Sequence, residues 1–360
     1  MYLKQYVCNK TDLQNKDFIF GMLVIKPTSK IKISSLVFIT VVVIFIVLIA
    51  YVQNHYWMTY SSQTLYVDDR FKILQISDTQ IHSMNEKCRD LTPKQLLWPC
   101  DGTNTTAFVR RLVELEQPDF VVFAGDNVIG RTTKQAWRVL EQVIAPVIES
   151  NIPMGIVMGN HDRERKRVSI PTLYQNIRTM SDTTLVGNTR IKIHGPNNTL
   201  QVFLFDYAYG AHKLPAGGLR PWAKEQIDWY RSKSDRDVPT LVFGHLPLDT
   251  YKRLNKSNVV GDWNTAVTSA NGKTQLWDAM QSQYVVAYSA GHNHINDFCG
   301  RLQPETPLLC YSGAAGYTTG GRKGWPRRAR VFIWNTTNVI TYKRLDNGSI
   351  IDTQYVNFYK

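Results

Sequence analysis

Short apolar runs alternate with polar stretches along the chain, and this pattern predicts an α/β fold. Two segments between the runs, residues 106–116 and 134–150, carry apolar side chains at helical spacing, and residues 222–231 form a third expected helix. Strands that alternate with helices are typical of parallel sheets. The runs that predict strands buried on both faces are residues 71–77, 119–124, 155–158, 240–243 and 284–289.

The remaining strands are predicted from alternation. Residues 191–193 and 201–206 have the pattern of a hairpin in a second sheet, with a turn at residues 195–197. Near the C-terminus, further strands are expected to finish that second sheet, at residues 331–334, 339–344 and 350–358. We therefore predict one domain over residues 70–360, made of two packed sheets with helices outside.

A polar stretch follows each of the five strand-like runs. Ligands of α/β sheets bind beyond the carboxyl ends of the strands, so these side chains are expected to share one cleft. A glycine before most of them would let the backbone turn tightly. Carboxylates, amides and imidazoles are the donors that hold a pair of divalent metals. The stretches are Asp78-Thr79-Gln80, Gly125-Asp126-Asn127, Gly159-Asn160-His161-Asp162, Gly244-His245 and Gly291-His292-Asn293-His294.

Taken singly, each stretch is weak evidence, but their ordered set resembles the calcineurin-like metallophosphoesterase superfamily over residues 71–331. Residues 291–300 and 324–330 are most similar to the purple-acid-phosphatase-like group of plants and fungi. The resemblance implies a two-sheet β-sandwich flanked by helices. It also implies a phosphoric ester hydrolase, preferably a phosphatase, in which a hydroxide bridging two divalent ions of Fe, Zn or Mn attacks a phosphorylated substrate.

The resemblance also implies roles for individual residues. His161 would stand beside the leaving-group oxygen as a general acid or transition-state donor, oriented by Asp162. The expected metal ligands are Asp78, His294 and Gln80 for the first metal, Asp126 as the bridge, and Asn160, His245 and His292 for the second metal.

Two positions depart from the family pattern. Gln80 stands where the pattern has histidine, and its neutral amide is a weaker donor, so the first metal is expected to bind less tightly. His82 is a possible substitute ligand. Ile129 stands where purple acid phosphatases have a tyrosine that binds ferric iron, so neither the colour nor an obligatory ferric ion is expected.

The longest apolar run, residues 36–52, has seventeen residues and no charge, which is the lower limit for a membrane helix. A signal peptide is the alternative, but the run begins late and lacks a clear cleavage site. Lysines before the run place the N-terminus in the cytosol by the positive-inside rule. We predict a cytosolic tail (1–35), a transmembrane signal anchor (36–52) and a stalk (53–69), with the catalytic domain lumenal or extracellular in a single-pass type II arrangement.

Cysteines and glycosylation sequons agree with an oxidising compartment. After the apolar run, local spacing favours two disulfides, Cys88–Cys100 and Cys299–Cys310, whereas the spacings are too long for a zinc site. A glycoprotein is expected from the sequons at Asn104, Asn197, Asn255, Asn335 and Asn347.

The formal net charge of +13 favours anionic partners. Charge alone would suit a phosphorylated substrate, nucleic acid or anionic lipid, and no nucleic-acid partner is otherwise indicated. The sequence leaves the oligomeric state open. Two alternatives to the phosphatase also remain: a phosphodiesterase of nucleotides or lipid head groups, and a catalytically weak cell-surface binding protein, the latter suggested by Gln80.

Overall fold

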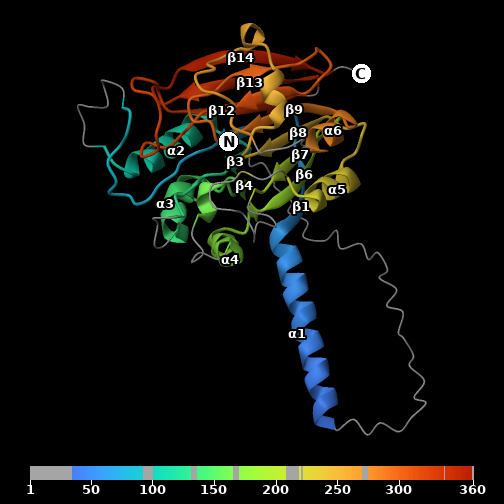
Figure 1. The fold of residues 1–360 in the computed structure, drawn as a ribbon. Coiled ribbons are helices and arrows are strands. Elements are labelled where there is room, and N and C mark those ends of the chain that lie inside the picture. Colours follow the sequence, from blue (N-terminus) through green and yellow to red (C-terminus); the bar gives the residue numbers. More distant parts are fainter. Residues whose placement is uncertain are drawn as a thin grey trace.

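The computed structural model describes residues 35–91, 100–130, 136–164, 170–207, 219, 222–269, 275–335 and 337–358. Two stacked β-sheets make up the body, helices cover their outer faces, and helix α1 projects from the body (Figure 1). The expected α/β architecture of two packed sheets flanked by helices is therefore confirmed for the described residues.

Each sheet has seven strands. Sheet A has the order β1 (Tyr60–Tyr66), β6 (Asn188–His194), β7 (Thr199–Phe205), β8 (Thr240–Gly244), β9 (Val285–Ala290), β11 (Leu308–Tyr311), β10 (Cys299–Gly300). Sheet B has the order β14 (Ile350–Asn357), β13 (Asn338–Leu345), β12 (Arg328–Trp334), β2 (Phe71–Ile76), β3 (Phe120–Ala124), β4 (Met154–Val157), β5 (Thr184–Val186). The strands from β2 to β5 pair in parallel, as do β7, β8, β9 and β11.

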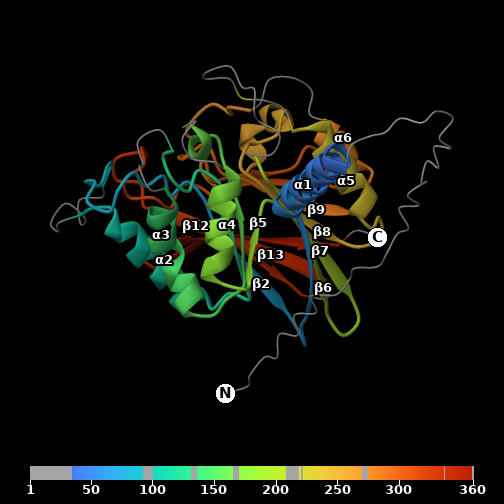
Figure 2. The same cartoon turned by 90° about the horizontal axis from the view of Figure 1, so that it is seen from below.

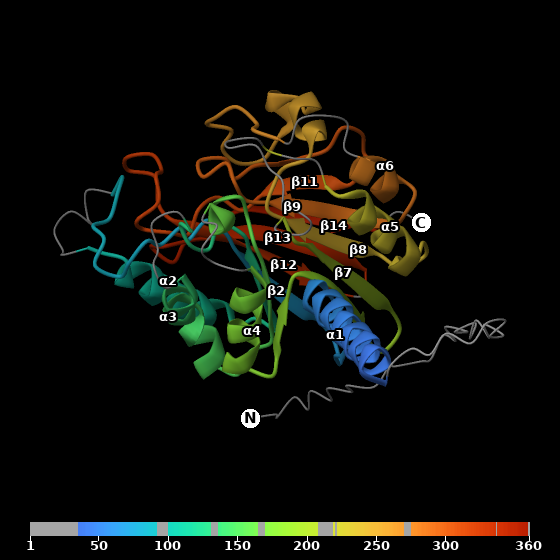
Figure 3. The ribbon, with the colours of Figure 1, turned by 60° about the horizontal axis from the view of Figure 1, so that its bottom comes forward.

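The apolar runs are continuous because their strands are covered on both faces. Val121 of β3 packs outward, against helices α2 (Thr103–Glu116), α3 (Ala136–Glu149) and α4 (Ile170–Met180). Its neighbour Val122 packs inward, between the sheets. In β7, Val202 faces inward and Phe203 packs against α5 (Lys224–Lys233) and α6 (Gln275–Gln281). Figures 2 and 3 show the two helical layers on opposite sides of the paired sheets.

The C-terminal strands join a different sheet from the one expected. Strand β12 pairs antiparallel with β2, with Phe332 opposite Ile73, so β12, β13 and β14 extend sheet B rather than the sheet of the β6–β7 hairpin. Phe332 contacts Phe243 of sheet A edge to face, with ring centroids 5.4 Å apart. Alternation indicates that a strand has a buried face but does not select its partner strand, and this is why the expectation was wrong.

The expected stalk is also partly wrong. Residues 60–66 form strand β1, which pairs in parallel with β6 along its whole length. Leu65 is buried in the core between the sheets. The folded body therefore begins at Tyr60 rather than near residue 70, because an edge strand of mixed polarity still gains a full ladder of backbone hydrogen bonds.

Helix α1 spans Ser35–Thr59 and contains the apolar run. Its described side chains are mostly exposed, with Phe38 64% and Ile46 59% accessible. Taking only the described residues, the structure has no helix that is long and apolar enough to cross a membrane. The expected cytosolic tail lies outside the described residues except for Ser35.

Both disulfides favoured by local spacing are present in the structure. Cys88 is bonded to Cys100 in the long loop after β2, and Cys299 is bonded to Cys310 across the short β10–β11 pair. Each bond closes a small loop, which limits the conformations open to the unfolded chain.

Candidate metal centre

The predicted site residues come together where strands of both sheets end. Asp78, Asp126 and Asn160 follow β2, β3 and β4 of sheet B, and His245 and His292 follow β8 and β9 of sheet A. The sheets are very close at this point, because a Cβ atom on Gly125 would lie 2.7 Å from the His245 ring. The predicted site residues are therefore brought together by strand ends of two sheets and not of one.

Four residues of the predicted metal site have a strained backbone conformation. Asp78, Gln80, Asp126 and His292 have positive φ angles of 55°, 40°, 50° and 71°. Non-glycine residues rarely adopt this left-handed conformation, which costs about 1–3 kcal/mol and is concentrated at functional sites. The strand ends are thus bent so that consecutive site residues point into the same space.

The motif glycines are needed for close approach more than for turning. Of the four glycines that precede site residues, Gly125 has a positive φ of 91°. A Cβ atom on Gly159 would lie 2.2 Å from Asp126 Oδ1, and one on Gly291 would lie 1.8 Å from Ser77 Oγ. Both distances are far below van der Waals contact, so any side chain there would push the site apart.

Asp126 lies at the middle of the cluster. One ligand atom each from Asp126, His245 and His292 lies within 4.8 Å of the others. Asp126 Oδ2 is 3.1 Å from His245 Nε2, and Asp126 Oδ1 accepts the backbone N–H of His161 at 2.7 Å. Asn160 Oδ1 lies 3.1 Å from the same His245 nitrogen. Asp126 thus contacts His245 and the His161 backbone directly, and its role as a bridge between two metals stays a prediction.

The second part of the cluster contains Asp78 and His294. Asp78 Oδ1 is 3.4 Å from His294 Nε2. Asp78 Oδ2 accepts hydrogen bonds from Ser77 Oγ at 2.6 Å and from the His292 backbone N–H at 2.9 Å. These bonds fix the carboxylate and leave Oδ1 directed at His294.

Unsatisfied polar atoms test whether the residues fit metal ions. Among the described residues, Asp78 Oδ1 and His292 Nδ1 are buried side-chain atoms without a hydrogen-bond partner. Leaving a polar atom unpaired in the interior costs about 1–3 kcal/mol, so such atoms call for a ligand. A carboxylate oxygen and an imidazole nitrogen are both good donors to Zn²⁺, Fe²⁺ or Mn²⁺. The set therefore fits a metal centre.

The shifted pKa values of two histidines also favour a metal centre. Burial lowers the pKa of His245, but Asp126 outweighs burial and raises that pKa to about 9. Burial and the nearby His245 lower the pKa of His292 to about 4. The buried carboxylates thus favour one positive charge on His245, whereas burial and that charge disfavour a proton on His292. A divalent cation meets this need, because it neutralises the carboxylates and leaves both imidazoles free to coordinate.

Gln80 lies inside the cluster, but its amide nitrogen faces the other ligands. Nε2 is 3.0 Å from both Asp126 Oδ2 and His294 Nε2, whereas Oε1 accepts a 2.6 Å hydrogen bond from Thr319 Oγ1. Coordination through oxygen would require the amide to rotate by half a turn. His82, the possible substitute ligand, instead has its Nε2 3.8 Å from Glu86 Oε2.

We expect Gln80→His to raise metal affinity at the first position, because imidazole nitrogen is a better donor than an amide and no N–H then competes with the cation. Metal content after dialysis should rise, and the metal concentration at half-maximal activity should fall by about tenfold or more. The exposed Gln303→His variant serves as the control. Unchanged stoichiometry and midpoint would show that residue 80 is not a ligand.

The structure corrects the role expected for Asp162. Its Oδ1 accepts the Val128 N–H at 2.8 Å and its Oδ2 accepts the Gly159 N–H at 2.7 Å. Burial, and next Asp126, raise the pKa of Asp162 to about 7. Asp162 therefore ties the loops after β3 and β4 together and does not orient His161. The expected role came from the family resemblance, and in this chain Asp162 bonds to the backbone of two loops instead.

Three residues that support the site were missed from the sequence. Ser77 holds Asp78, Thr319 holds Gln80, and Glu164 lies 2.7 Å from Nδ1 of His161. Glu164 could have been found from its three-residue spacing to His161. No local pattern singles out Thr319, which reaches the site from a loop far along the chain.

Comparisons with known proteins find sequence relatives and a shared fold. The family model described as "Calcineurin-like phosphoesterase" matches residues 71–296. The chain is 33% identical to "Probable inactive purple acid phosphatase 28" of Arabidopsis thaliana, over 80% of this chain and 84% of that protein. It is 30% identical to "Phosphatase DCR2" of Saccharomyces cerevisiae, over 78% of this chain and 54% of that protein.

A solved structure shares the fold. A dimetal phosphatase from Danio rerio superposes with a TM-score of 0.57 at 13% identity, covering 81% of this chain and 100% of that one. At this identity the likeness shows the fold alone. Together with the sequence relatives, it confirms the resemblance drawn from the ordered motifs.

Proposed function

The chain belongs to the calcineurin-like phosphoesterase family, and on that premise we propose that it is a dinuclear-metal-dependent phosphatase acting on phosphomonoesters. The observation that carries the proposal is the convergence of buried Asp126 and His245 with part-buried His292, whose ligand atoms lie within 4.8 Å of one another. His161 lies beside this cluster with its side chain 35% exposed, so a substrate can reach it from solvent.

The proposed metal ligands are those whose donor atoms meet in the cluster. Bound there, two divalent ions of Fe, Zn or Mn would supply Lewis-acid stabilisation of the phosphoryl group and an activated water at neutral pH. We assign Asp78, Gln80 and His294 to the first position, Asp126 to the bridge, and Asn160, His245 and His292 to the second position.

His161 performs the remaining chemistry in this proposal. Its Nε2 is 3.9 Å from Asp126 Oδ2, so that nitrogen faces the reacting centre while Nδ1 faces away. A proton donated from Nε2 neutralises the leaving-group oxygen as its bond to phosphorus breaks. The backbone N–H of His161, bonded to Asp126 Oδ1, holds the ring at this distance.

Relatives support a phosphatase over a phosphodiesterase. One is named a phosphatase. The word "inactive" in another relative's name concerns that protein. The specific observation that favours a catalytically weak binding protein here is the Gln80 amide nitrogen facing Asp126 and His294.

Hydrolysis of matched substrates tests the proposal. The full-length protein, loaded with Mn²⁺ or with Fe²⁺ and Zn²⁺, is assayed on p-nitrophenyl phosphate and bis(p-nitrophenyl) phosphate. We expect kcat/KM for the monoester to exceed that for the diester by about tenfold or more. A chelator that removes the metal should abolish hydrolysis. The reverse preference would make the protein a phosphodiesterase. No turnover of either ester with any metal would favour the binding protein.

We further propose that the apolar run anchors the protein in a membrane of the secretory pathway or cell surface, with the catalytic domain on the lumenal or outer side. Exposed apolar side chains on α1 and the two disulfides support this proposal. In sealed vesicles, external protease should remove only a short N-terminal tail, and glycosidase should lower the apparent mass. Digestion of the folded domain from outside would contradict it.

A further inference from the structure

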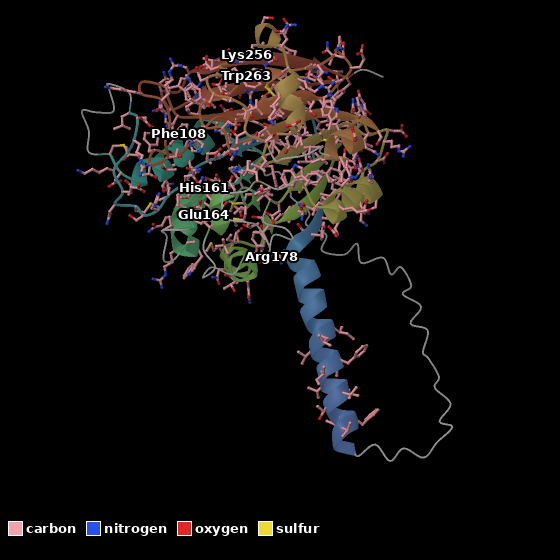
Figure 4. All side chains as sticks on the ribbon, in the orientation of Figure 1. Phe108, His161, Glu164, Arg178, Lys256 and Trp263 are labelled. Carbon is pink, nitrogen blue, oxygen red and sulfur yellow. A yellow bond between two sulfur atoms is a disulfide. The ribbon has the colours of Figure 1, made fainter. Side chains whose placement is uncertain are left out.

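Asp126 lies on the Nε2 side of the His161 ring, and a second carboxylate, that of Glu164, contacts the Nδ1 side. His161 opens the short 3₁₀ helix η2 (His161–Arg163), and Glu164 follows it directly. Residues three apart on a 3₁₀ helix lie on the same face. As a result, Glu164 Oε1 is 2.7 Å from His161 Nδ1, and the two side chains lie side by side (Figure 4). The Glu164 backbone N–H also donates to the His161 carbonyl oxygen at 3.3 Å.

The two ring nitrogens of His161 therefore face different partners. Nε2 faces Asp126, 3.9 Å away, and Nδ1 faces Glu164. Asp162 takes no part in holding the ring, because its oxygens accept from the Val128 and Gly159 backbone N–H groups. Among the described residues, Glu164 is the carboxylate within hydrogen-bond distance of Nδ1.

We propose that Glu164 is the positioning residue for His161: its carboxylate accepts the Nδ1–H bond and so keeps Nε2 directed at the leaving-group oxygen. This inference rests on the proposed phosphatase function and deepens it. Glu164 acts through His161 and does not touch the substrate. The same hydrogen bond serves the ring before and after proton transfer, because Nδ1 stays protonated in both states.

The reaction in which His161 donates its proton is the hydrolysis of a phosphomonoester by one water molecule. The water oxygen forms a new bond to phosphorus, and the leaving oxygen takes the electron pair of its breaking P–O bond together with the proton from Nε2. A proton released by the attacking water then restores His161. The products are an alcohol and inorganic phosphate, and Glu164 is not consumed in the reaction.

Leaving-group dependence distinguishes positioning from a general structural role. An alkyl monoester such as glycerol phosphate needs a proton on its leaving oxygen, whereas p-nitrophenolate leaves readily without one. We expect Glu164→Ala to lower kcat about 30–100-fold on the alkyl ester, with much less effect on p-nitrophenyl phosphate and on KM. Glu164→Gln keeps an acceptor oxygen and should recover part of the loss. The exposed Glu225→Ala variant should match wild type.

A spectroscopic measurement tests the contact without turnover. In metal-loaded full-length protein with ¹⁵N-labelled histidine, the His161→Gln variant identifies the signals of His161 among the eight histidines. We expect Nδ1 of His161 to be protonated in wild type and in Glu164→Gln, and to become a mixture of tautomers in Glu164→Ala.

Three results would overturn the inference: equal losses on both esters, loss confined to KM, or identical imidazole spectra in wild type and Glu164→Ala. If the wild-type protein hydrolyses neither ester, the proposed function fails. The nitrogen shifts then still decide whether Glu164 holds the ring.

Discussion

Replacement of Asp126 by asparagine is expected to lower phosphatase kcat by about a thousandfold or more, because it removes the charge shared by both metal positions. Asp126 is fully buried, and its two oxygens are engaged by the His161 backbone and by His245 Nε2 at 2.7 and 3.1 Å. An asparagine has nearly the same shape, so the fold should survive. Steady-state kinetics and bound-metal content measured on the same sample check this outcome.

The matched control is Asp278→Asn, which removes an exposed acid from helix α6 and should leave both metal content and kcat unchanged. Circular dichroism should show the same fold in both variants. If Asp126→Asn keeps more than about a tenth of wild-type kcat at saturating metal, the carboxylate does not bridge the metals, and the ligand set has to be redrawn.

Much of this centre could be predicted because its signals are local. The predicted ligands lie within a few residues after apolar runs, and Val121 and Val122 of β3 show that such a run is buried on both faces. Parallel strands deliver the side chains beyond their ends to one edge. The pattern was therefore enough to place Asp78 and Asp126 at one edge of sheet B, but it did not show that His292 joins them from sheet A.

The wrong predictions concern features that depend on residues distant along the chain or on the exact turn geometry. The partner of β12 is decided by which sheet edge is free, and β2 offers an edge that the local pattern of residues 331–334 cannot reveal. Strand β1 is mostly polar, so the pattern of apolar residues along the chain did not predict its pairing with β6. Glu164 was missed because the family resemblance assigned the orienting role to Asp162, whereas the 3₁₀ turn brings the residue three positions on against His161.

Removal of Asp297 is expected to cause the largest loss of stability. Asp297 is fully buried, with Lys343 Nζ 2.7 Å from its Oδ1, the Asp262 N–H donating to Oδ1 at 2.7 Å, and Arg328 Nη1 on its Oδ2. Arg330 donates to the Asp297 carbonyl oxygen at 2.5 Å. Asp297→Ala leaves buried cations without their main counter-charge, which should lower the free energy of unfolding by about 3–5 kcal/mol.

Urea unfolding of the full-length protein at neutral pH measures this loss. The control is Asp237→Ala, an exposed residue of the loop before β8, which should change the unfolding free energy by less than about 0.5 kcal/mol. A change of similar size in the two variants would mean that solvent or local rearrangement supplies Arg328 and Lys343 with other partners.

The pH dependence separates lost charge from lost packing at Asp297. Burial raises the pKa of Asp297, but Lys343 and Arg328 outweigh burial and hold that pKa below its usual value of 3.8. A lowered folded-state pKa stabilises the fold at pH values above the unfolded-state pKa, and this contribution disappears as the pH falls through the folded-state pKa. The difference between wild type and Asp297→Ala should therefore be constant from neutral pH down to about pH 5 and shrink in stronger acid. If the difference stays constant in strong acid as well, the loss comes from the cavity left by the side chain and not from its charge.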